Sequence, residues 1–175
     1  MNKSEQIQIN SYLTFRLGKE EYAAHVSKVL NILEMTDITA VPKSPEYMKG
    51  VINLRGMVLP VIDTRLKFGM PETAYTDKTC IVVMDLEMDG GIVHVGALVD
   101  EVVAVVELEK NQVKPPPSIG DTYKSDFITG LAKMDDHFIM ILDLIKIFST
   151  NEINIIKENM EVSPVNEENE DVEIA

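Results

Sequence analysis

The sequence predicts a mainly β protein in which two small, related β subdomains pack on each other, with short helices between strands. Short apolar runs follow one another along most of the 175 residues. Turn-forming residues separate them at close intervals, which is typical of small barrels and sandwiches. Two stretches, VLPVIDTRLKF at 58–68 and FIMILDLIKIF at 138–148, also align with each other. This weak internal repeat indicates two related units.

The first half opens with a strand at 13–17, where apolar and polar residues alternate as they do in a half-buried strand. A polar turn at 18–21 leads to a short return strand at 22–24. The helical spacing of apolar residues at 26–30 predicts one helical turn, and the chain then extends over 32–35. This region therefore begins as a short meander of strands.

A short helix is predicted before the centre of the first half. Ser44 is a typical N-cap residue, and Pro45 suits the first helical position. We expect this helix to include Met48 and to end at Gly50.

An apolar hairpin follows. Its strands, 51–54 and 58–62, flank the turn Arg55-Gly56. Glycine allows the positive φ that such a tight turn requires. The hairpin is expected to lead into a short helix at 65–68.

Arg55 is the single charged residue at the tip of this otherwise apolar hairpin. An arginine is costly to bury without a partner. Arg55 is therefore either exposed for contact with another protein or paired with Glu46 or Asp63, in which case it only holds the hairpin together.

The second half has the same pattern of short strands, a hairpin and a short helix. We expect strands at 80–86, 93–99 and 102–108, then a hairpin of 127–132 with 138–142, and a last helical turn at 143–148. The first of these runs is almost continuously apolar, which is typical of a strand that is buried on both faces. Three prolines at 115–117 cannot continue a ladder and predict a loop to about residue 123.

These patterns divide the chain into three parts. Residues 1–10 are polar and are expected to be flexible. Residues 11–150 form the folded domain, with the first subdomain at about 11–75 and the second at about 76–150. The tail at 151–175 is strongly acidic and is expected to be disordered, as a solubilising end would be.

The charge and composition exclude several classes of partner and location. A net charge of -13 argues against nucleic acid and anionic lipid as main partners, because both require a positive protein surface. No apolar stretch is long enough to span a membrane, and the first ten residues contain no signal-peptide core. We therefore expect a cytoplasmic protein. The single Cys80 cannot form an intrachain disulfide, which is consistent with a reducing compartment.

The sequence shows no motif for cofactor or metal chemistry. His25, His94 and His137 are far apart, and none has a metal-ligand neighbour at suitable spacing. No phosphate loop or dinucleotide fingerprint is present, so no cofactor is expected. The remaining enzymatic alternative is a spatially assembled site that uses Asp63, His137 and Asp143.

Four stretches of the chain form a recognisable set. The main one is KGVINLRGMVLPVIDTRLKFG at 49–69, and it is accompanied by YLTFRLGKEEYA at 12–23, GALVDEV at 96–102 and FITGLAKMDDHFIMILDLIKIF at 127–148. Together they resemble the CheW family of bacterial chemotaxis coupling proteins. The resemblance extends over about 12–148. It implies a pair of five-stranded, SH3-like β-barrels that share a hydrophobic core.

The resemblance also implies a role. CheW-like proteins are non-enzymatic adaptors that join the cytoplasmic tips of chemoreceptors to the histidine kinase CheA, in arrays attached to the membrane. The adaptor itself does not enter the membrane. A CheW-like adaptor in a non-chemotactic sensory pathway is the alternative within this family, and the acidic tail lies outside the family pattern.

The family pattern places two contact regions on this chain. The receptor-binding positions are Ile32, Glu34, Met35, Arg55 and Gly56, and the kinase-binding positions are Val102 and Val105 in the second barrel. An apolar groove with a few polar anchors suits a helical receptor tip, and the rigid donor fork of arginine suits such an anchor. Without the resemblance, Ile32 and Met35 would be interpreted as core residues and Glu34 as a solvated strand residue.

Overall fold

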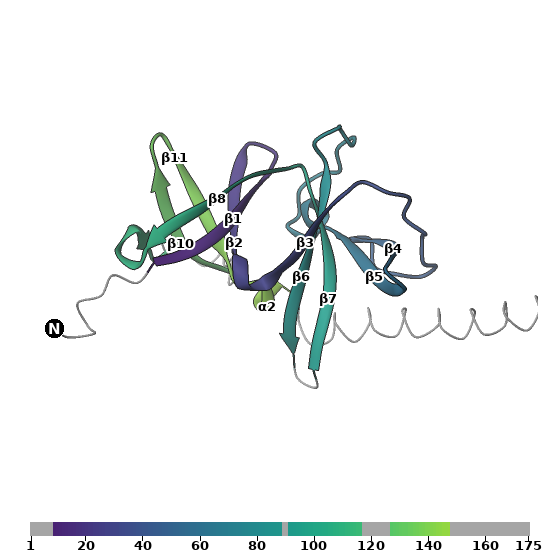
Figure 1. Cartoon of the computed structure of the whole chain (residues 1–175). Helices are drawn as coiled ribbons and strands as arrows, with labels where there is room; N and C mark the ends of the chain where they lie inside the picture. Colours follow the sequence, from purple (N-terminus) through teal and green to yellow (C-terminus); the bar gives the residue numbers. More distant parts are fainter. Residues whose placement is uncertain (1–8, 89–90, 117–126, 148–175) are drawn as a thin grey trace, which may run out of the picture.

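The structure is a computed structural model that describes residues 9–88, 91–116 and 127–147. Its strands form two sheets that lie side by side, with short helices at their junction (Figure 1). A mainly β fold of two sheets with short helices is therefore confirmed. The described strands number six in one sheet and five in the other, and neither sheet closes into a complete barrel.

The six-stranded sheet has the order β8-β1-β2-β11-β10-β9. Its neighbouring strands are antiparallel except for β2 and β11, which are parallel. The strands are β1 (Ile9–Leu17), β2 (Glu20–His25), β8 (Glu101–Glu109), β9 (Val113–Lys114), β10 (Ile128–Met134) and β11 (His137–Leu142).

The five-stranded sheet has the order β3-β6-β7-β5-β4. Here too one neighbouring pair, β5 and β7, is parallel. The strands are β3 (Val29–Glu34), β4 (Met48–Leu54), β5 (Met57–Asp63), β6 (Cys80–Met88) and β7 (Gly91–Val99). An isolated bridge between Thr39 and Val51 adds a single pair on the outer side of β4.

The helices are short and connect strands. They are α1 (Thr64–Lys67), α2 (Leu144–Ile147) and the 3-10 turns η2 (Val26–Lys28) and η3 (Lys110–Gln112). Asp63 caps α1, because its carboxylate accepts a hydrogen bond from the Leu66 N–H at 3.2 Å. The expected helical turns after both hairpins are thus present. The one expected at 26–30 is a 3-10 turn that gives way to β3 at Val29.

The boundary that the sequence suggests near residue 75 does not separate the two sheets. The β1–β2 hairpin of the first half lies in one sheet with β8 to β11, and the β6–β7 hairpin of the second half lies in the other sheet with β3 to β5. Each parallel pair joins a strand of the first half to a strand of the second half. Each sheet therefore contains a hairpin from the other half of the chain. At the N-terminus, β1 begins at Ile9, within the segment expected to be flexible; residues 1–8 and the tail at 151–175 lie outside the described residues.

The two halves are nevertheless repeats, as the sequence alignment suggests. Each sheet contains three antiparallel strands (β8-β1-β2 or β3-β6-β7), then a parallel join, then a hairpin (β11-β10 or β5-β4), in the same order. The hairpin ladders shift register at the same place, between Met48 and Gly50 in one half and between Ile128 and Gly130 in the other. These pairs lie 80 residues apart, as do Asp63 and Asp143 in the aligned stretches.

Backbone hydrogen bonds repeat as well. The Asp63 N–H donates to the Tyr47 carbonyl at 2.7 Å, and the Asp143 N–H donates to the Phe127 carbonyl at 2.7 Å. Asp63 ends the second strand of its hairpin and Asp143 directly follows the second strand of the other, and each directly precedes a short helix. The repeat is therefore structural and is not a coincidence of composition.

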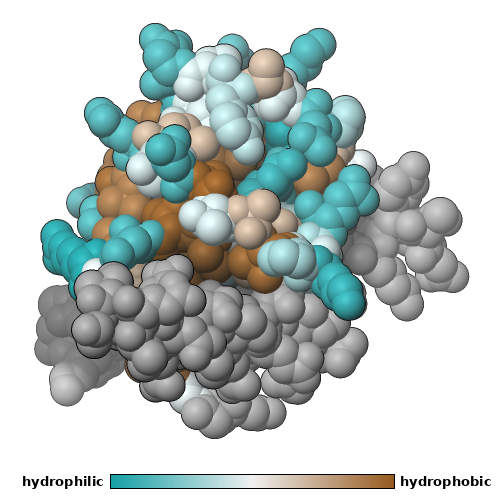
Figure 2. All heavy atoms as spheres, turned by 90° about the vertical axis from the view of Figure 1, so that its right-hand side faces the viewer, coloured by the Kyte–Doolittle hydropathy of each residue, from teal (hydrophilic) through white to brown (hydrophobic). Residues whose placement is uncertain are grey.

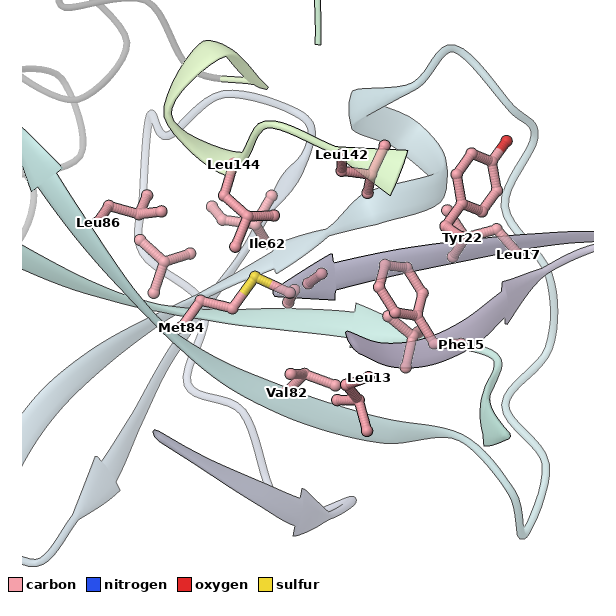
Figure 3. Close-up of a cluster of buried hydrophobic side chains, with 14 of the residues drawn as sticks. Leu13, Phe15, Leu17, Tyr22, Ile62, Val82, Met84, Leu86, Leu142 and Leu144 are labelled. Atoms are coloured by element: carbon pink, nitrogen blue, oxygen red, sulfur yellow. The ribbon is translucent and has the colours of Figure 1, made fainter. Parts of the chain in front are cut away.

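The main hydrophobic cluster lies between the two sheets. It takes Leu13 and Phe15 from β1 and Val82 and Met84 from β6 (Figure 3). A second cluster lies inside the five-stranded sheet and a third inside the six-stranded sheet. Burial of one such large side chain contributes about 1.5–3 kcal/mol, so the shared central cluster makes each sheet depend on the other.

A buried carboxylate lies where the halves meet in the six-stranded sheet. Glu21 of β2 is buried, and its Oε1 lies 2.9 Å from Nε2 of His137 at the start of β11. The Nδ1 atom of the same histidine lies 3.2 Å from Asp136. The hydrogen bond to Asp136 raises the pKa of His137 most; desolvation opposes this rise, and Glu21 adds to it.

We expect this contact to make stability depend on pH. The pKa of His137 is raised in the folded state. The contribution of protonated His137 to the free energy of unfolding is therefore fully present below its unfolded pKa of about 6.5. This contribution is lost as the pH rises through the folded pKa. Thermal unfolding of the wild type and of His137→Gln, measured from pH 5.5 to 8.5, checks this. The melting temperatures of the two proteins should converge at high pH, and a constant difference would contradict the prediction.

Candidate protein-binding surface

The edge strand β3 exposes an apolar face. Its side chains alternate, so that Leu30, Ile32 and Glu34 point outward, while Val29, Asn31 and Leu33 are half-buried. Leu30 is 51% exposed and Ile32 44% exposed. β3 pairs only with β6, so its other edge is open among the described strands.

The β4–β5 turn presents Arg55. Leu54 pairs with Met57, leaving Arg55 and Gly56 as a two-residue loop whose φ values are 52° and 86°. Two successive positive φ values are typical of a type I′ turn, which matches the twist of a hairpin. The Asn53 side chain accepts a hydrogen bond from the Gly56 N–H at 2.8 Å and fixes the loop.

Arg55 is exposed, and it forms no ion pair with any residue that the structure describes. The alternative in which it holds the hairpin through Asp63 is wrong, because that carboxylate is buried, caps α1 and lies 4.0 Å from the Lys49 ammonium. Arg55 thus lies at the tip of a turn whose backbone is fixed by the Asn53 side chain. An exposed cation on a rigid element is suited to contact with another protein.

β3 and the hairpin tip lie around one small core. Leu33 and Met35, from the β3 side, and Leu54, beside the tip, pack against the same buried cluster. Met35 is therefore half-buried, as its interpretation as a core residue predicts, while Ile32 is exposed. We name the exposed side chains of Leu30, Ile32 and Glu34, together with the Arg55-Gly56 turn, the β3 surface.

The hydropathy of this end of the molecule fits a binding face. Figure 2 shows the side on which β4 and β5 lie in Figure 1: hydrophobic side chains gather in its middle, with hydrophilic ones above them and to the sides. Met57, next to the turn, is 46% exposed. An apolar centre within a polar rim is the usual anatomy of a protein–protein interface.

The two residues expected to contact the kinase have different environments. Both lie on β8, an edge strand that pairs only with β1 among the described strands. Val105 is 61% exposed, whereas Val102 packs against the central cluster. Val105 is therefore available to a partner and Val102 supports the core.

Leu30 is the member of the β3 surface that the sequence interpretation missed. The helical spacing of Val26, Val29 and Leu30 favours a turn that would make Leu30 part of an apolar face. The period of two across Leu30, Ile32 and Glu34 was the signal that could have identified it as an outward-facing strand residue.

The residues of the enzymatic alternative do not converge. His137 begins β11 and Asp143 follows its end, which separates them by about 20 Å at 3.3 Å per residue. Asp63 lies in the other sheet, where it caps α1. No group of three potential metal ligands is found among the residues that the structure describes. The central cavity of about 20 Å³ is lined mainly by apolar side chains, among them Phe15, Met84 and Leu142, so the described chain offers no preformed polar site there.

The comparisons with known proteins agree on one family. The model of the CheW-like domain matches residues 11–152. The chemotaxis protein CheW of Klebsiella aerogenes is 32% identical over 83% of this chain and 85% of its own length. The probable chemotaxis protein CheW of Rhizobium etli is 34% identical over 80% and 88%.

A solved structure is similar over the same region. The scaffolding protein TtCheW from Thermoanaerobacter tengcongensis has 31% identity and a TM-score of 0.73, and the match covers 83% of this chain and 96% of that one. Within the described residues, no helix has both the length and the apolar character that a membrane span requires.

Proposed function

This chain belongs to the CheW-like domain family, and on that basis we propose that it links the cytoplasmic tips of chemoreceptors to the regulatory domain of the histidine kinase CheA. It is a chemotaxis scaffold protein and not an enzyme. In this proposal it acts in the cytoplasm, at receptor arrays that are anchored in the membrane by the receptors alone.

The receptor contact is assigned to the β3 surface. Two observations carry this assignment: Arg55 is exposed at a hairpin whose Leu54 packs on the same small core as Leu33 of β3, and the other face of β3 exposes Ile32. A receptor tip is a helical hairpin, and the apolar stripe of such a helix can pack on Leu30 and Ile32. Arg55 then fixes the register by pairing with a carboxylate of the receptor.

The kinase contact is assigned to β8. Val105 is the most exposed of the apolar side chains on this strand, and the open edge of β8 gives a partner access to it. The two contacts lie in different sheets and share no residue, so receptor and kinase can bind at the same time. Many weak contacts of this kind can build a cooperative array.

Arg55→Glu is expected to weaken receptor binding strongly without changing kinase binding. The substitution places a negative charge where the receptor carboxylate would lie, so we expect the Kd for a receptor cytoplasmic fragment to rise at least tenfold. Isothermal titration of the full chain against the receptor fragment and against the kinase regulatory domain measures both affinities.

Lys43→Glu is the matched control. Lys43 is also exposed and also has a positive φ, of 61°, but it lies outside the β3 surface. The assignment of Arg55 fails if both substitutions have the same effect on the receptor. The proposed function fails if the folded wild-type chain binds neither partner.

A further inference from the structure

The internal repeat makes residues of the two sheets equivalent, position by position. The β4–β5 hairpin corresponds to the β10–β11 hairpin, whose residues come 80 positions later in the chain. In the parallel joins, Val61 lies opposite Gly96, and Ile141, the counterpart of Val61, lies opposite Ala23. Gly96 and Ala23 are therefore equivalent, and with them the β6–β7 and β1–β2 hairpins.

Val95 of β7 is accordingly the counterpart of Tyr22 of β2, since each directly precedes one of these two small residues. Their antiparallel partners agree with this equivalence: Val95 pairs with Met84, and Tyr22 pairs with Phe15. All four side chains belong to the central cluster. A residue that packs on Tyr22 in one half of the repeat should therefore have a counterpart that packs on Val95 in the other half.

Phe68 is a residue that packs on Tyr22. It directly follows α1, and the centre of its ring lies 5.5 Å from that of Tyr22 and 4.7 Å from that of Phe127, on which it stacks. Aromatic pairs at such distances contribute to stability beyond the apolar area that they bury. Phe68 thus holds the end of the five-stranded sheet against the six-stranded sheet.

The counterpart of Phe68 in the second half is Phe148, which follows Ile147 and lies outside the described residues. Each phenylalanine is the fifth residue after an equivalent aspartate, Asp63 or Asp143. The short helix between aspartate and phenylalanine is present in both halves, as α1 and as α2. Phe148 is therefore attached to the end of α2 in the way that Phe68 is attached to the end of α1.

Tyr47 is in turn the counterpart of Phe127. Each of their carbonyls accepts a hydrogen bond of 2.7 Å from the N–H of the aspartate that precedes the short helix of the same half. Both aromatic side chains also pack against the central cluster. The repeat therefore predicts two contacts for Phe148, which are the Val95 side chain and the Tyr47 ring.

The central cavity lies where the repeat places this ring. Its wall includes Val95, one of the two predicted contacts, and Ile147, the last described residue before Phe148. The lining is apolar apart from two residues of α1, and Leu144 points from α2 into the cluster that forms it (Figure 3). The volume available to the centre of a water molecule is about 20 Å³, and the empty space is about 420 Å³ when the opening to solvent is included. A ring attached directly after Ile147 can therefore reach this opening and close it.

We infer that Phe148 docks into the central cavity, against Val95 and Tyr47, and anchors the acidic tail of the chain at the junction of the two sheets. The cavity takes side chains from both sheets, among them Phe15 of β1 and Leu142 of β11, so a ring that fills it holds one sheet against the other. The family model ends at residue 152. The anchor therefore lies within the family domain, and most of the tail that it fixes extends beyond that domain.

Methyl NMR spectroscopy of the full chain tests the contact directly. We expect nuclear Overhauser effects between the ring protons of Phe148 and the methyl groups of Val95. We also expect a ring-current shift of the Val95 methyl signals that is lost in Phe148→Leu, a variant that keeps an apolar side chain and so preserves the fold. Ile153→Leu, which changes the next apolar residue of the tail, is the matched control and should leave the Val95 signals unchanged.

Urea unfolding measures what the contact contributes to stability. Phe148→Ala should lower the urea midpoint about as much as Phe68→Ala does, because the two substitutions remove equivalent aromatic side chains. The losses caused by Phe148→Ala and Val95→Ala should not add, since these residues are in contact. Ile92→Ala, at a position of the same strand that is 60% exposed, should add to Phe148→Ala. A chain that ends after residue 152 should keep the wild-type midpoint, and one that ends after residue 147 should unfold like Phe148→Ala.

The outcomes are distinct. A Phe148–Val95 contact together with non-additive losses supports the inference. If the contact is absent and Phe148→Ala unfolds at the same urea concentration as the wild type, the inference is overturned. A contact that appears only at high protein concentration would come from a second copy of the chain and would overturn it as well. Receptor and kinase take no part in these measurements, so their result is independent of the proposed function.

Discussion

Gly50→Ala is expected to lower the free energy of unfolding by about 3–5 kcal/mol, because backbone strain and overpacking each cost about 1–3 kcal/mol. Gly50 has a φ of 147°, which a residue with a Cβ rarely adopts. A Cβ at this place would lie 2.1 Å from the Thr39 carbonyl oxygen and 2.9 Å from Cγ2 of Ile38. The carbonyl cannot move freely, since two hydrogen bonds of 2.8 and 2.9 Å hold Thr39 to Val51.

Urea unfolding of the wild type and of Gly50→Ala measures this loss. Gly69→Ala is the matched control: its φ of 79° is also positive, but no atom lies within 4 Å of the added Cβ. The control should cost about 1 kcal/mol, which is the conformational penalty alone. Equal losses in the two variants would show that the close approach of Thr39 to β4 contributes nothing.

The strands could be predicted from the sequence because their signal is local. Alternation at 13–17 and the continuous apolar run at 80–86 both correspond to observed strands, β1 and β6. The repeat was also visible, since Asp63 and Asp143 align and each directly precedes a short helix. The exchange of hairpins between the halves was not predictable in this way, because β2–β11 and β5–β7 pairing joins residues far apart in the chain.

The helix expected at Ser44 and Pro45 is absent. The Ser44 hydroxyl donates a hydrogen bond to the Val41 carbonyl at 2.8 Å and does not cap a helix, and β4 begins at Met48. Only a few residues remain before the strand, and the nucleation of so short a helix is unfavourable. Pairing of β4 with β5 therefore overrides the local capping signal.

The candidate site was predictable only in part, because exposure depends on contacts between residues far apart in the chain. Arg55 stands out as a single charge in an apolar hairpin, and the structure places it at an exposed turn. Which apolar residues of β3 and β8 face outward depends on how each sheet packs on the other, so Leu30 is exposed while Val102 is half-buried.

One polar contact joins the two sheets across their junction. The Asp100 carboxylate accepts hydrogen bonds from Nε of Arg65 at 2.9 and 3.0 Å, from Nη2 of Arg65 at 2.8 Å and from the Gly18 N–H at 2.7 Å. Arg65 belongs to α1, at the end of the five-stranded sheet, and Gly18 belongs to the β1–β2 turn of the other sheet. The Arg65 side chain is only 15% exposed, so this ion pair is poorly solvated.

Asp100→Asn is accordingly expected to lower the free energy of unfolding by about 2–4 kcal/mol, because it leaves a largely buried guanidinium without its counter-charge. Glu101→Gln is the neighbouring control; it weakens a pair with Arg16 that is 3.5 Å long and more exposed, and should cost less than about 1 kcal/mol. The loss in Asp100→Asn should also depend on pH. Burial alone would raise the pKa of Asp100, but the hydrogen bonds from Arg65 and Gly18 lower it below the usual 3.8.

A carboxylate with a lowered pKa contributes its full stability above the unfolded value and loses it as the pH falls through the folded value. The wild type and Asp100→Asn should therefore differ most near neutral pH and converge in strong acid, and urea unfolding at pH 7, 4 and 3 measures the difference. A difference that stays constant with pH would mean that the asparagine disturbs packing and that the charge of Asp100 is not what holds the sheets together. Convergence would instead identify the Arg65–Asp100 pair as an electrostatic link between the five-stranded sheet, which carries the β3 surface, and the six-stranded sheet.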